Sequence, residues 1–279
     1  MTDRRRWNAG SRNGPGIHIR CTHLCALLWL LCTVLAARAE LKPESKTAYQ
    51  KYIASLDTEM AAQSHSASGF LWIDRDQARQ QAVRKGDIVT QQVKVVSVPD
   101  GMIQDWIGGV FLPGATLARV TQVDQDYSDY ARIYGPDITR VTVVSHSGNR
   151  FVVAYRITKT KVLTAVLDTV QVIDYMPLAR DRMAIRSQSQ SVRQVENAGK
   201  PSERDLPEGE GSGFLWAMNS YWRMEERDGG VYMECEAITL SRDVPFGMGA
   251  LINPILESFA EESLKKTIEA KRRAVGLSQ

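Results

Sequence analysis

The stretch from Phe214 to Leu240 limits the fold of this chain more than any other part of the sequence. Read with the period of two of a β-strand, one face of its first half carries Trp216, Met218, Trp222 and Met224. A turn follows within Arg227 to Gly230, with either Asp228-Gly229 or Gly229-Gly230 at its tip. Residues 231–240 then return as the partner strand, so the stretch predicts a half-buried β-hairpin.

The same faces of the two predicted strands lie opposite each other whichever of the two turns forms. Met233, Cys235 and Ala237 oppose the Trp222 side, so apolar side chains meet there. Glu234 and Glu236 oppose the Arg223 side, where we expect an ion-pair ladder in solvent. Paired carboxylates can also transfer protons, but exposure to solvent is the simpler interpretation of these two.

The segment after Pro245 has the period of a helix. One stripe carries Ile252, Ile255, Leu256 and Phe259, so a long amphipathic helix is expected to lie across the sheet. A second stripe carries Leu264, Ile268, Lys271 and Val275, roughly 140° away from the first at 100° per residue. One straight helix cannot bury both stripes, which predicts a kink or break within 260–263.

The N-terminal segment resembles an export signal. Five arginines precede an apolar run of fourteen residues, 24–37, and Ala37-Arg38-Ala39 has the form of a cleavage site. The run is shorter than the roughly 18 residues that span a bilayer. The sequence therefore predicts a signal peptide over 1–39 and a periplasmic or secreted protein, with an uncleaved anchor as the alternative.

Removal of this segment changes the charge balance. Six of the 35 Lys and Arg residues precede residue 40 but only one of the 32 Asp and Glu does, which leaves 29 and 31. Nucleic-acid binding needs a basic surface, so no nucleic-acid partner is expected. Cys235 is the one cysteine that remains after residue 39, so burial of a core, without internal disulfides, must stabilise the fold.

The order of predicted elements is α+β with an antiparallel sheet. Helices over 46–63 and 75–85 form an N-terminal extension, 40–86, that packs on a main domain, 87–279. In that domain strands 89–98 and 102–112 precede a helix from Thr116 to Tyr134. Gly108-Gly109 indicates a bulge or a close approach of neighbouring backbone. Strands 138–145, 150–158, 162–175 and 182–195 follow, and 196–213 is expected to be a long exposed loop.

This order resembles the helix-grip fold of the START and polyketide-cyclase-like (SRPBCC) superfamily. The resemblance covers roughly 86–275 and rests on Asp105 to Gly114, Tyr127 to Pro136, and Tyr221-Trp222-Arg223 through Pro245. It implies a curved antiparallel sheet wrapped around a long C-terminal helix. It also implies a cavity between them that holds an apolar ligand. The superfamily shares no catalytic motif, so the resemblance implies no catalytic residue here.

The sequence gives little support for metal binding, for catalysis by histidine or cysteine, or for phosphate binding. His65 and His146 are expected in connectors, which does not favour a metal site or a catalytic triad. Cys235 lies on the apolar strand face without a histidine nearby, as a buried small hydrophobic residue would. Asp124 to Ser128 begins like a calcium loop but lacks its later ligands. The glycines of 209–213 precede a strand, whereas a phosphate-binding loop precedes a helix. No metal and no cofactor are predicted.

Three functional hypotheses remain from the sequence. The first is binding or transfer of a lipid-like apolar molecule, with a wall of large and adaptable side chains. Its residues are Trp106, Tyr134, Met218, Trp222, Met224, Met233, Ile252, Ile255 and Phe259. Each of them could instead be ordinary core. The second is a cyclase or aromatase acting in the same cavity, which requires ionisable groups inside it. The third is an envelope protein that docks a partner through residues 40–85.

Overall fold

The computed structural model describes residues 39–64, 69–160, 164–243 and 249–276, and only the backbone of 249–257. The chain divides into two compact units, residues 1–37 and 38–279, and every described residue belongs to the second. The predicted signal sequence up to Arg38 and the predicted position of His65 lie outside the described residues.

The described elements follow the predicted order of helices and strands. The helices are α2 (Pro43–Ser64), η1 (Trp72–Arg75), α3 (Gln77–Arg84), α4 (Leu117–Gln125), η2 (Tyr127–Asp129), α5 (Tyr130–Ile133) and α6 (Gly249–Gly276). The strands are β1 (Ala39–Glu40), β2 (Val89–Val98), β3 (Gly101–Pro113), β4 (Ile138–Ser147), β5 (Arg150–Thr160), β6 (Thr164–Ala179), β7 (Arg182–Glu196), β8 (Arg204–Asp205), β9 (Glu210–Gly211), β10 (Ala217–Arg227) and β11 (Gly230–Arg242).

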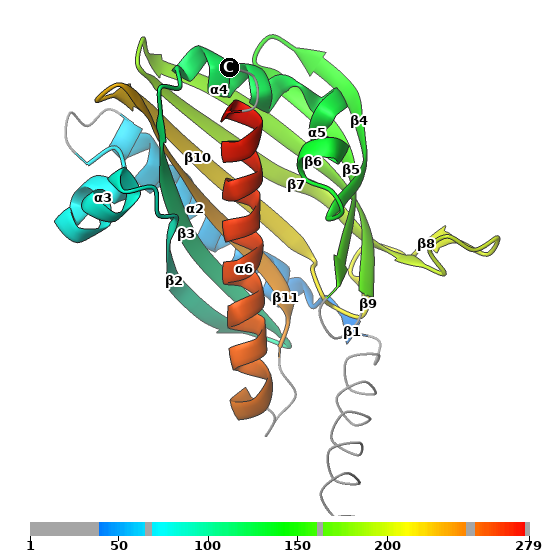
Figure 1. Ribbon diagram of the computed structural model, residues 1–279. Coiled ribbons are helices and arrows are strands. Elements are labelled where there is room, and N and C mark those ends of the chain that lie inside the picture. The colour runs from blue at the N-terminus through cyan, green and yellow to red at the C-terminus, as the bar shows by residue number, and fades with distance from the viewer. Residues whose placement is uncertain (1–38, 65–68, 161–163, 244–248, 277–279) are drawn as a thin grey trace, which may run out of the picture. The chain divides into compact units, whose positions relative to one another are not determined.

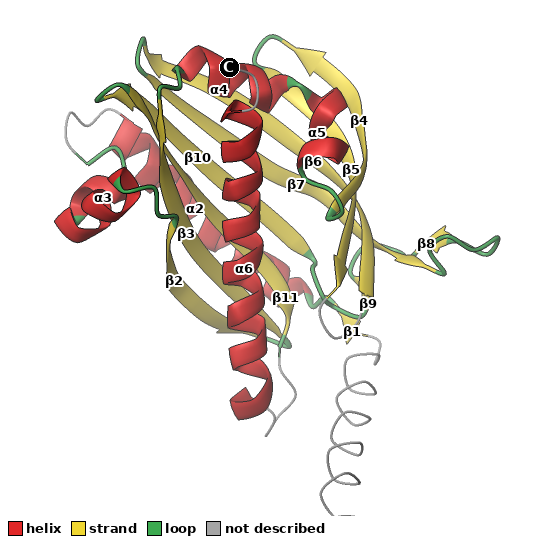
Figure 2. Ribbon diagram, viewed as in Figure 1, coloured by secondary structure: helices red, strands yellow, loops and turns green. Residues whose placement is uncertain are grey.

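A curved antiparallel sheet forms the middle layer (Figures 1 and 2). Its strand order is β2-β3-β11-β10-β7-β6-β5-β4, with β8 beside β7, while β1 and β9 pair separately. In Figure 1, α6 lies in front of this sheet and α2 lies behind it. We call the face toward α6 the inner face and the face toward α2 the outer face. The chain is therefore α+β with the helix-grip arrangement that the sequence predicts.

The central hairpin confirms the predicted pairing. Trp222 lies opposite Cys235 and Arg223 opposite Glu234. Asp228 and Gly229 form the tip, with φ of 57° and 75°, and glycine adopts such values without steric cost. Trp216 is an exception, because it precedes β10 and packs in the outer-face cluster that contains Tyr49.

Three details of the chain differ from the prediction. The helix expected over 116–134 is broken into α4, η2 and α5. His146 lies in β4, near its end and exposed, where its ring stacks on Phe151 at 3.9 Å. The segment 196–213 contains β8 and β9, and Leu206 is buried within it, so it is not simply an exposed loop.

The terminal helix shows no break where one was predicted. α6 is continuous from Gly249 to Gly276. Its second stripe is buried, since Leu264, Ile268, Lys271 and Val275 are each at most 5% exposed. A straight helix can bury this stripe alone; the side chains of Ile252, Ile255 and Leu256 lie outside the described residues.

The expected solvent-exposed ladder on the outer face is buried, so that prediction was wrong. Glu234 is 0% exposed and Glu236 is 6% exposed. One Glu234 oxygen lies 2.5 Å from Arg223 Nε, and its carboxylate accepts hydrogen bonds from the backbone N–H groups of Trp72 and Ile73. The N-terminal extension thus covers the charges, which the alternation of a single hairpin could not indicate.

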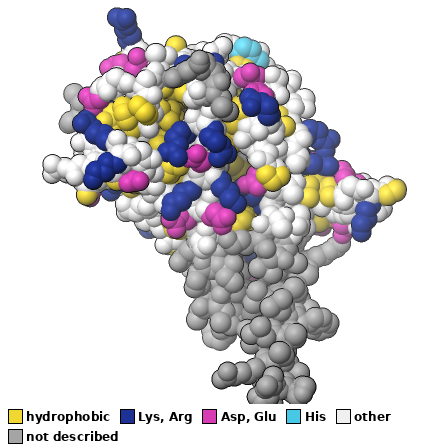
Figure 3. All heavy atoms as spheres, viewed as in Figure 1, with side chains coloured by type: hydrophobic (Ala, Val, Ile, Leu, Met, Phe, Trp, Pro, Cys, Tyr) yellow, Lys and Arg dark blue, Asp and Glu magenta, His cyan; other side chains and the backbone are white. Residues whose placement is uncertain are grey.

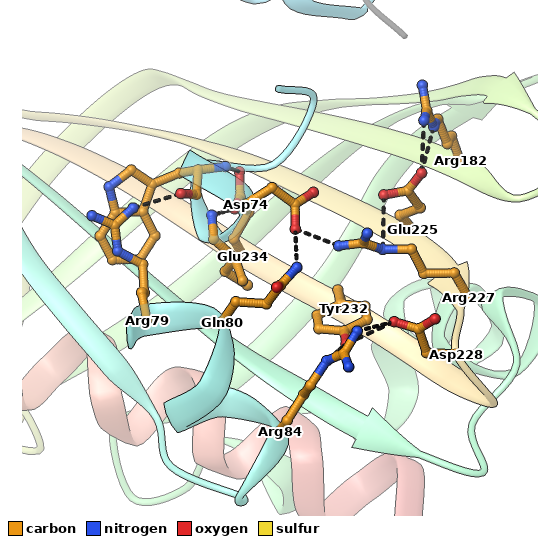
Figure 4. A network of polar contacts seen from close by, with 12 residues as sticks. Asp74, Arg79, Gln80, Arg84, Arg182, Glu225, Arg227, Asp228, Tyr232 and Glu234 are labelled. Carbon is orange, nitrogen blue, oxygen red and sulfur yellow. Dashed lines mark hydrogen bonds and ion pairs between the residues drawn. The ribbon is translucent and has the colours of Figure 1, made fainter. Parts of the chain in front are cut away.

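The covered network continues along the hairpin toward its turn (Figure 4). Glu225 forms one ion pair with Arg182 at 2.7 Å and another with Arg227 at 3.2 Å. Arg227 also pairs with Asp74 of η1, which accepts a hydrogen bond from Gln80. Figure 4 shows Asp74, Gln80 and Arg227 meeting between η1, α3 and the hairpin, with Glu225 and Arg182 beyond Arg227. The extension is therefore joined to the sheet by charge as well as by apolar contact.

The glycine pair on β3 allows close approach from both sides of the sheet. A Cβ added to Gly109 would lie 2.6 Å from Ile73 Cδ1 of η1 on the outer face. A Cβ added to Gly108 would lie 3.0 Å from Ile268 Cδ1 of α6 on the inner face. The close approach predicted from the sequence is confirmed, and it brings η1 and α6 against adjacent residues of one strand.

Candidate functional site

A cavity of about 780 Å³ lies between α6 and the inner face of β5, β6, β7 and β10. Its apolar lining comes from several aromatic and branched side chains: Tyr130, Tyr134, Tyr155, Ile157, Ile173, Tyr175, Ile185, Met218 and Trp222. Cavities of roughly 300–1,000 Å³ hold drug-sized or cofactor-sized molecules. The size therefore suits one small amphipathic or apolar ligand.

The predicted ligand-binding residues fall into two groups. Tyr134, Met218 and Trp222 line the cavity. The others with described side chains, Trp106, Met224, Met233 and Phe259, are absent from its lining. Met224 and Met233 are each 0% exposed and belong to the solid core, and Phe259 packs on Phe214. The side chains of Ile252 and Ile255 lie outside the described residues. Ligand contact by the first group remains a prediction.

The position of α6 on the sheet explains why some predicted ligand-binding residues line the cavity and others do not. Among the described residues, none from β3 or β11 lines the cavity. On that side Ile268 lies close to Gly108 of β3, so side chains fill the interior. Cys235 of β11 is 3% exposed, which confirms its interpretation as buried, and burial raises the pKa of its thiol to about 12. A thiol with that pKa is a poor nucleophile near neutral pH.

Two buried ionisable side chains lie in the cavity wall. Lys271 of α6 places Nζ 2.7 Å from Asp124 Oδ1 at the end of α4, and both residues are 2% exposed. The same ammonium lies 3.4 Å from the centroid of the Trp222 ring, as in a cation–π contact. Burial raises the pKa of Asp124, and the Lys271 charge opposes this rise. The second carboxylate oxygen has no partner among the described residues.

Tyrosines surround the backbone of Asp124. Tyr175 and Tyr130 donate hydrogen bonds to its carbonyl oxygen at 2.7 and 2.5 Å, and the hydroxyls of Tyr127 and Tyr175 lie 2.9 Å apart. Burial raises the pKa of Tyr130 well above its usual value, so this hydroxyl stays protonated and can donate. Tyr127 and Tyr130 belong to the helix predicted over 116–134, and the structure places them in η2 and α5. Tyr130 and Tyr175 together hold the carbonyl group of Asp124.

A polar patch interrupts the apolar wall on β6, β7 and β10. Gln171, Ser187 and Ser220 all line the cavity. Ser187 donates to Gln171 Oε1 at 3.3 Å and lies opposite Ser220 in the strand pairing. The sequence analysis missed these residues. The signal was present in the alternation of Ser187-Gln188-Ser189, where serine occupies inner positions that continue from Met183 and Ile185.

Charged side chains border the cavity near α6. Lys159 contacts Asp137, and its Nζ donates to Ser263 Oγ of α6 at 2.8 Å, which joins the end of β5 to the helix. Lys265, Lys266, Glu269 and Arg273 also lie along this border. Figure 3 shows Lys and Arg side chains with Asp and Glu among them on the face that carries α6.

The arrangement can hold an apolar molecule, hydrogen-bond to it and, at Asp124, accept a proton. In the described part of the chain there is no group of His, Cys, Asp and Glu able to hold a metal ion. Within the same residues, no helix is both long enough and apolar enough to cross a membrane.

The fold and the cavity together define a helix-grip protein with room for a ligand. No protein-family model matches the sequence, and no curated protein matches it. Among solved structures, the chain is similar to a STAR-related lipid transfer protein fragment from Xanthomonas axonopodis, with 14% identity, a TM-score of 0.44, and coverage of 67% of this chain and 98% of that one.

The chain is similar to two further solved structures. The Zhui aromatase/cyclase from Streptomyces sp. R1128 has 14% identity, a TM-score of 0.43, and coverage of 62% of this chain and 94% of that one. A START superfamily protein from Mycobacterium smegmatis has 10% identity, a TM-score of 0.40, and coverage of 69% and 99%. These are the kinds of protein that the sequence was predicted to resemble, and the similarity concerns the fold alone.

Proposed function

We propose that this chain binds a hydrophobic, lipid-like molecule in the cavity between α6 and the sheet. The observation that carries the proposal is an interior space of about 780 Å³ beside a sheet whose other half is packed solid. Each 100 Å² of apolar ligand surface removed from water would contribute about 2.5 kcal/mol. The tyrosine, isoleucine and tryptophan side chains of the wall supply the apolar surface that such a ligand would contact.

We further propose that binding takes place outside the cytoplasm, in the periplasm or after secretion. The arginine-rich start, the apolar run 24–37 and the Ala37-Arg38-Ala39 site support export. The single cysteine after residue 39 is buried, so no free thiol is exposed among the described residues. In such a compartment a carrier would shield an apolar molecule from water during transfer.

The binding proposal is tested with purified, delipidated protein and a dansylated undecanoic acid as the probe. Trp222 lines the cavity, so bound probe should quench tryptophan emission and gain dansyl emission by energy transfer. Ser220→Phe places a ring in the cavity and should weaken probe binding at least tenfold. The matched control Ser145→Phe changes an exposed residue of β4 and should bind like the native protein. Absence of probe binding by the native protein would refute the proposal.

A second candidate function, a cyclase or aromatase type of enzyme, is favoured by one observation. It required ionisable groups inside the cavity, and Asp124 and Lys271 are placed there. A buried carboxylate with a raised pKa is a suitable base for removing a proton next to a carbonyl. The enolate carbon would then bond to a second carbonyl carbon of the same chain as the π bond of that carbonyl breaks. Lys271 would stabilise the resulting alkoxide, and the protonated Asp124 would return its proton to the alkoxide oxygen.

Asp124→Asn separates the two candidates. An enzyme would lose cyclisation of a poly-β-ketone thioester by roughly a hundredfold or more while it still bound the dansyl probe. If the native protein binds the probe but does not change the thioester, binding alone remains as the function.

A further inference from the structure

We propose that the cavity selects ligands that carry an oxygen atom partway along an otherwise apolar body, and that Gln171 binds this oxygen. This inference rests on the proposed binding function, which it makes more specific. It concerns the polar patch of Gln171, Ser187 and Ser220, and it does not involve the buried ion pair.

The amide of Gln171 is only partly satisfied by the protein. The side chain lines the cavity and is 2% exposed. Its Oε1 accepts the Ser187 hydroxyl at 3.3 Å, while its Nε2 has no hydrogen-bond partner among the described residues. The amide therefore carries a buried, unpaired donor beside a ligand-sized space.

A purely apolar ligand would leave these N–H groups buried and unpaired. A buried amide N–H without a hydrogen-bond partner is unfavourable, whereas an oxygen atom on the ligand would supply the missing acceptor. The next inner position of the same strand is occupied by the apolar Ile173, so an amide is not needed to build this part of the strand. The amide thus discriminates between ligands with and without an acceptor at this point.

The position of Gln171 along β6 places that oxygen away from both ends of the cavity. Tyr175, which bonds to Asp124, lies four residues further along the strand, roughly 13 Å away. In the other direction, Ala165 pairs with Lys159 at the cavity border, six residues or roughly 20 Å away. The polar group is therefore expected within the body of the ligand, in contrast to a terminal headgroup.

The test compares octadecanoic acid with octadecanoic acids that carry one keto group at different carbons, each as a competitor of the dansyl probe. In the native protein, ketones near one position should bind roughly tenfold more tightly than octadecanoic acid, as expected for one additional hydrogen bond. Gln171→Leu should remove this preference and keep or improve the binding of octadecanoic acid, which also shows that its cavity is intact.

Gln188→Leu serves as the matched control. Gln188 pairs with Val172 and Asn219 on the outer face of the sheet, so the ketone preference should persist. If native protein binds octadecanoic acid but prefers no ketone, or if Gln171→Leu keeps the preference, this inference is overturned and the binding function stands. If no fatty acid displaces the probe and the probe itself does not bind, the binding function fails and the inference fails with it.

Discussion

Removal of the Lys271 charge should destabilise the fold by leaving a carboxylate buried alone. In Lys271→Met, Asp124 loses the ammonium that lies 2.7 Å from its Oδ1. Breaking a buried ion pair by removing one partner costs about 3–5 kcal/mol. The cation–π contact with Trp222 is lost too, but the same ammonium makes both contacts, so the two costs overlap. We expect a loss of about 4 kcal/mol in the free energy of unfolding.

The loss should depend on pH in a defined direction. Burial already raises the pKa of Asp124 in the native fold, with Lys271 opposing the rise. Without Lys271 the folded-state pKa rises further above the unfolded value. The loss in the free energy of unfolding is then fully present above the folded-state pKa of Asp124. It decreases as pH falls toward the unfolded pKa, because burying the neutral acid costs less free energy than burying the carboxylate. Lys271→Met should therefore be closest to the native protein in acid.

Urea unfolding at pH 5 and pH 8, followed by circular dichroism, measures these free energies. The double variant Asp124→Leu with Lys271→Met removes both charges and should recover much of the stability lost at pH 8. The reasoning is refuted if Lys271→Met costs less than about 1 kcal/mol at pH 8, or if the double variant is no more stable than the single one.

Three further predictions concern the outer face. Gly109→Ala places a Cβ 2.6 Å from Ile73 Cδ1 and should cost about 1–3 kcal/mol in urea unfolding, with Ile73→Val restoring part of it. Burial raises the pKa of Glu236 to about 7 and that of Asp105 to about 6. Both folded-state values exceed the unfolded ones, so urea midpoints should rise from pH 8 to pH 5, and Glu236→Gln should flatten this dependence. Deletion of residues 39–85 should expose the outer-face core, so the chain should aggregate on gel filtration or unfold at a lower urea concentration. A monomer of unchanged stability would contradict this.

Strand periodicity predicted the central hairpin because the pleat itself sets which residues share a face. Trp222 opposite Cys235 and Arg223 opposite Glu234 follow from alternation once the turn is placed at Asp228-Gly229. The same rule failed for Trp216, which precedes the first residue of β10 and is not bound by its alternation. Periodicity is reliable only where the residues belong to one regular strand.

Long-range partners account for what the sequence could not predict. Lys271 was placed on the buried stripe of the tail helix, but nothing local identifies Asp124 at the end of α4 as its partner. Glu234 was expected in solvent because the residues that cover it, Trp72 and Ile73, belong to a distant segment. In both cases the choice between exposure and burial depends on tertiary packing, which alternation does not encode.

The two halves of the sheet pack differently against α6, and this difference explains the position of the cavity. On β3, η1 packs against Gly109 and α6 packs against Gly108, so this strand is held from both faces. The Glu234 carboxylate adds bonds between η1 and the neighbouring strand β11. Opposite these strands α6 is fixed, and a ligand could not enter without breaking that packing. The cavity instead lies along β5, β6, β7 and β10, where Lys159 joins the sheet to Ser263 of α6. A ligand should therefore enter on the Lys159 side of the helix, because the opposite half of the sheet is packed against both α6 and the N-terminal extension.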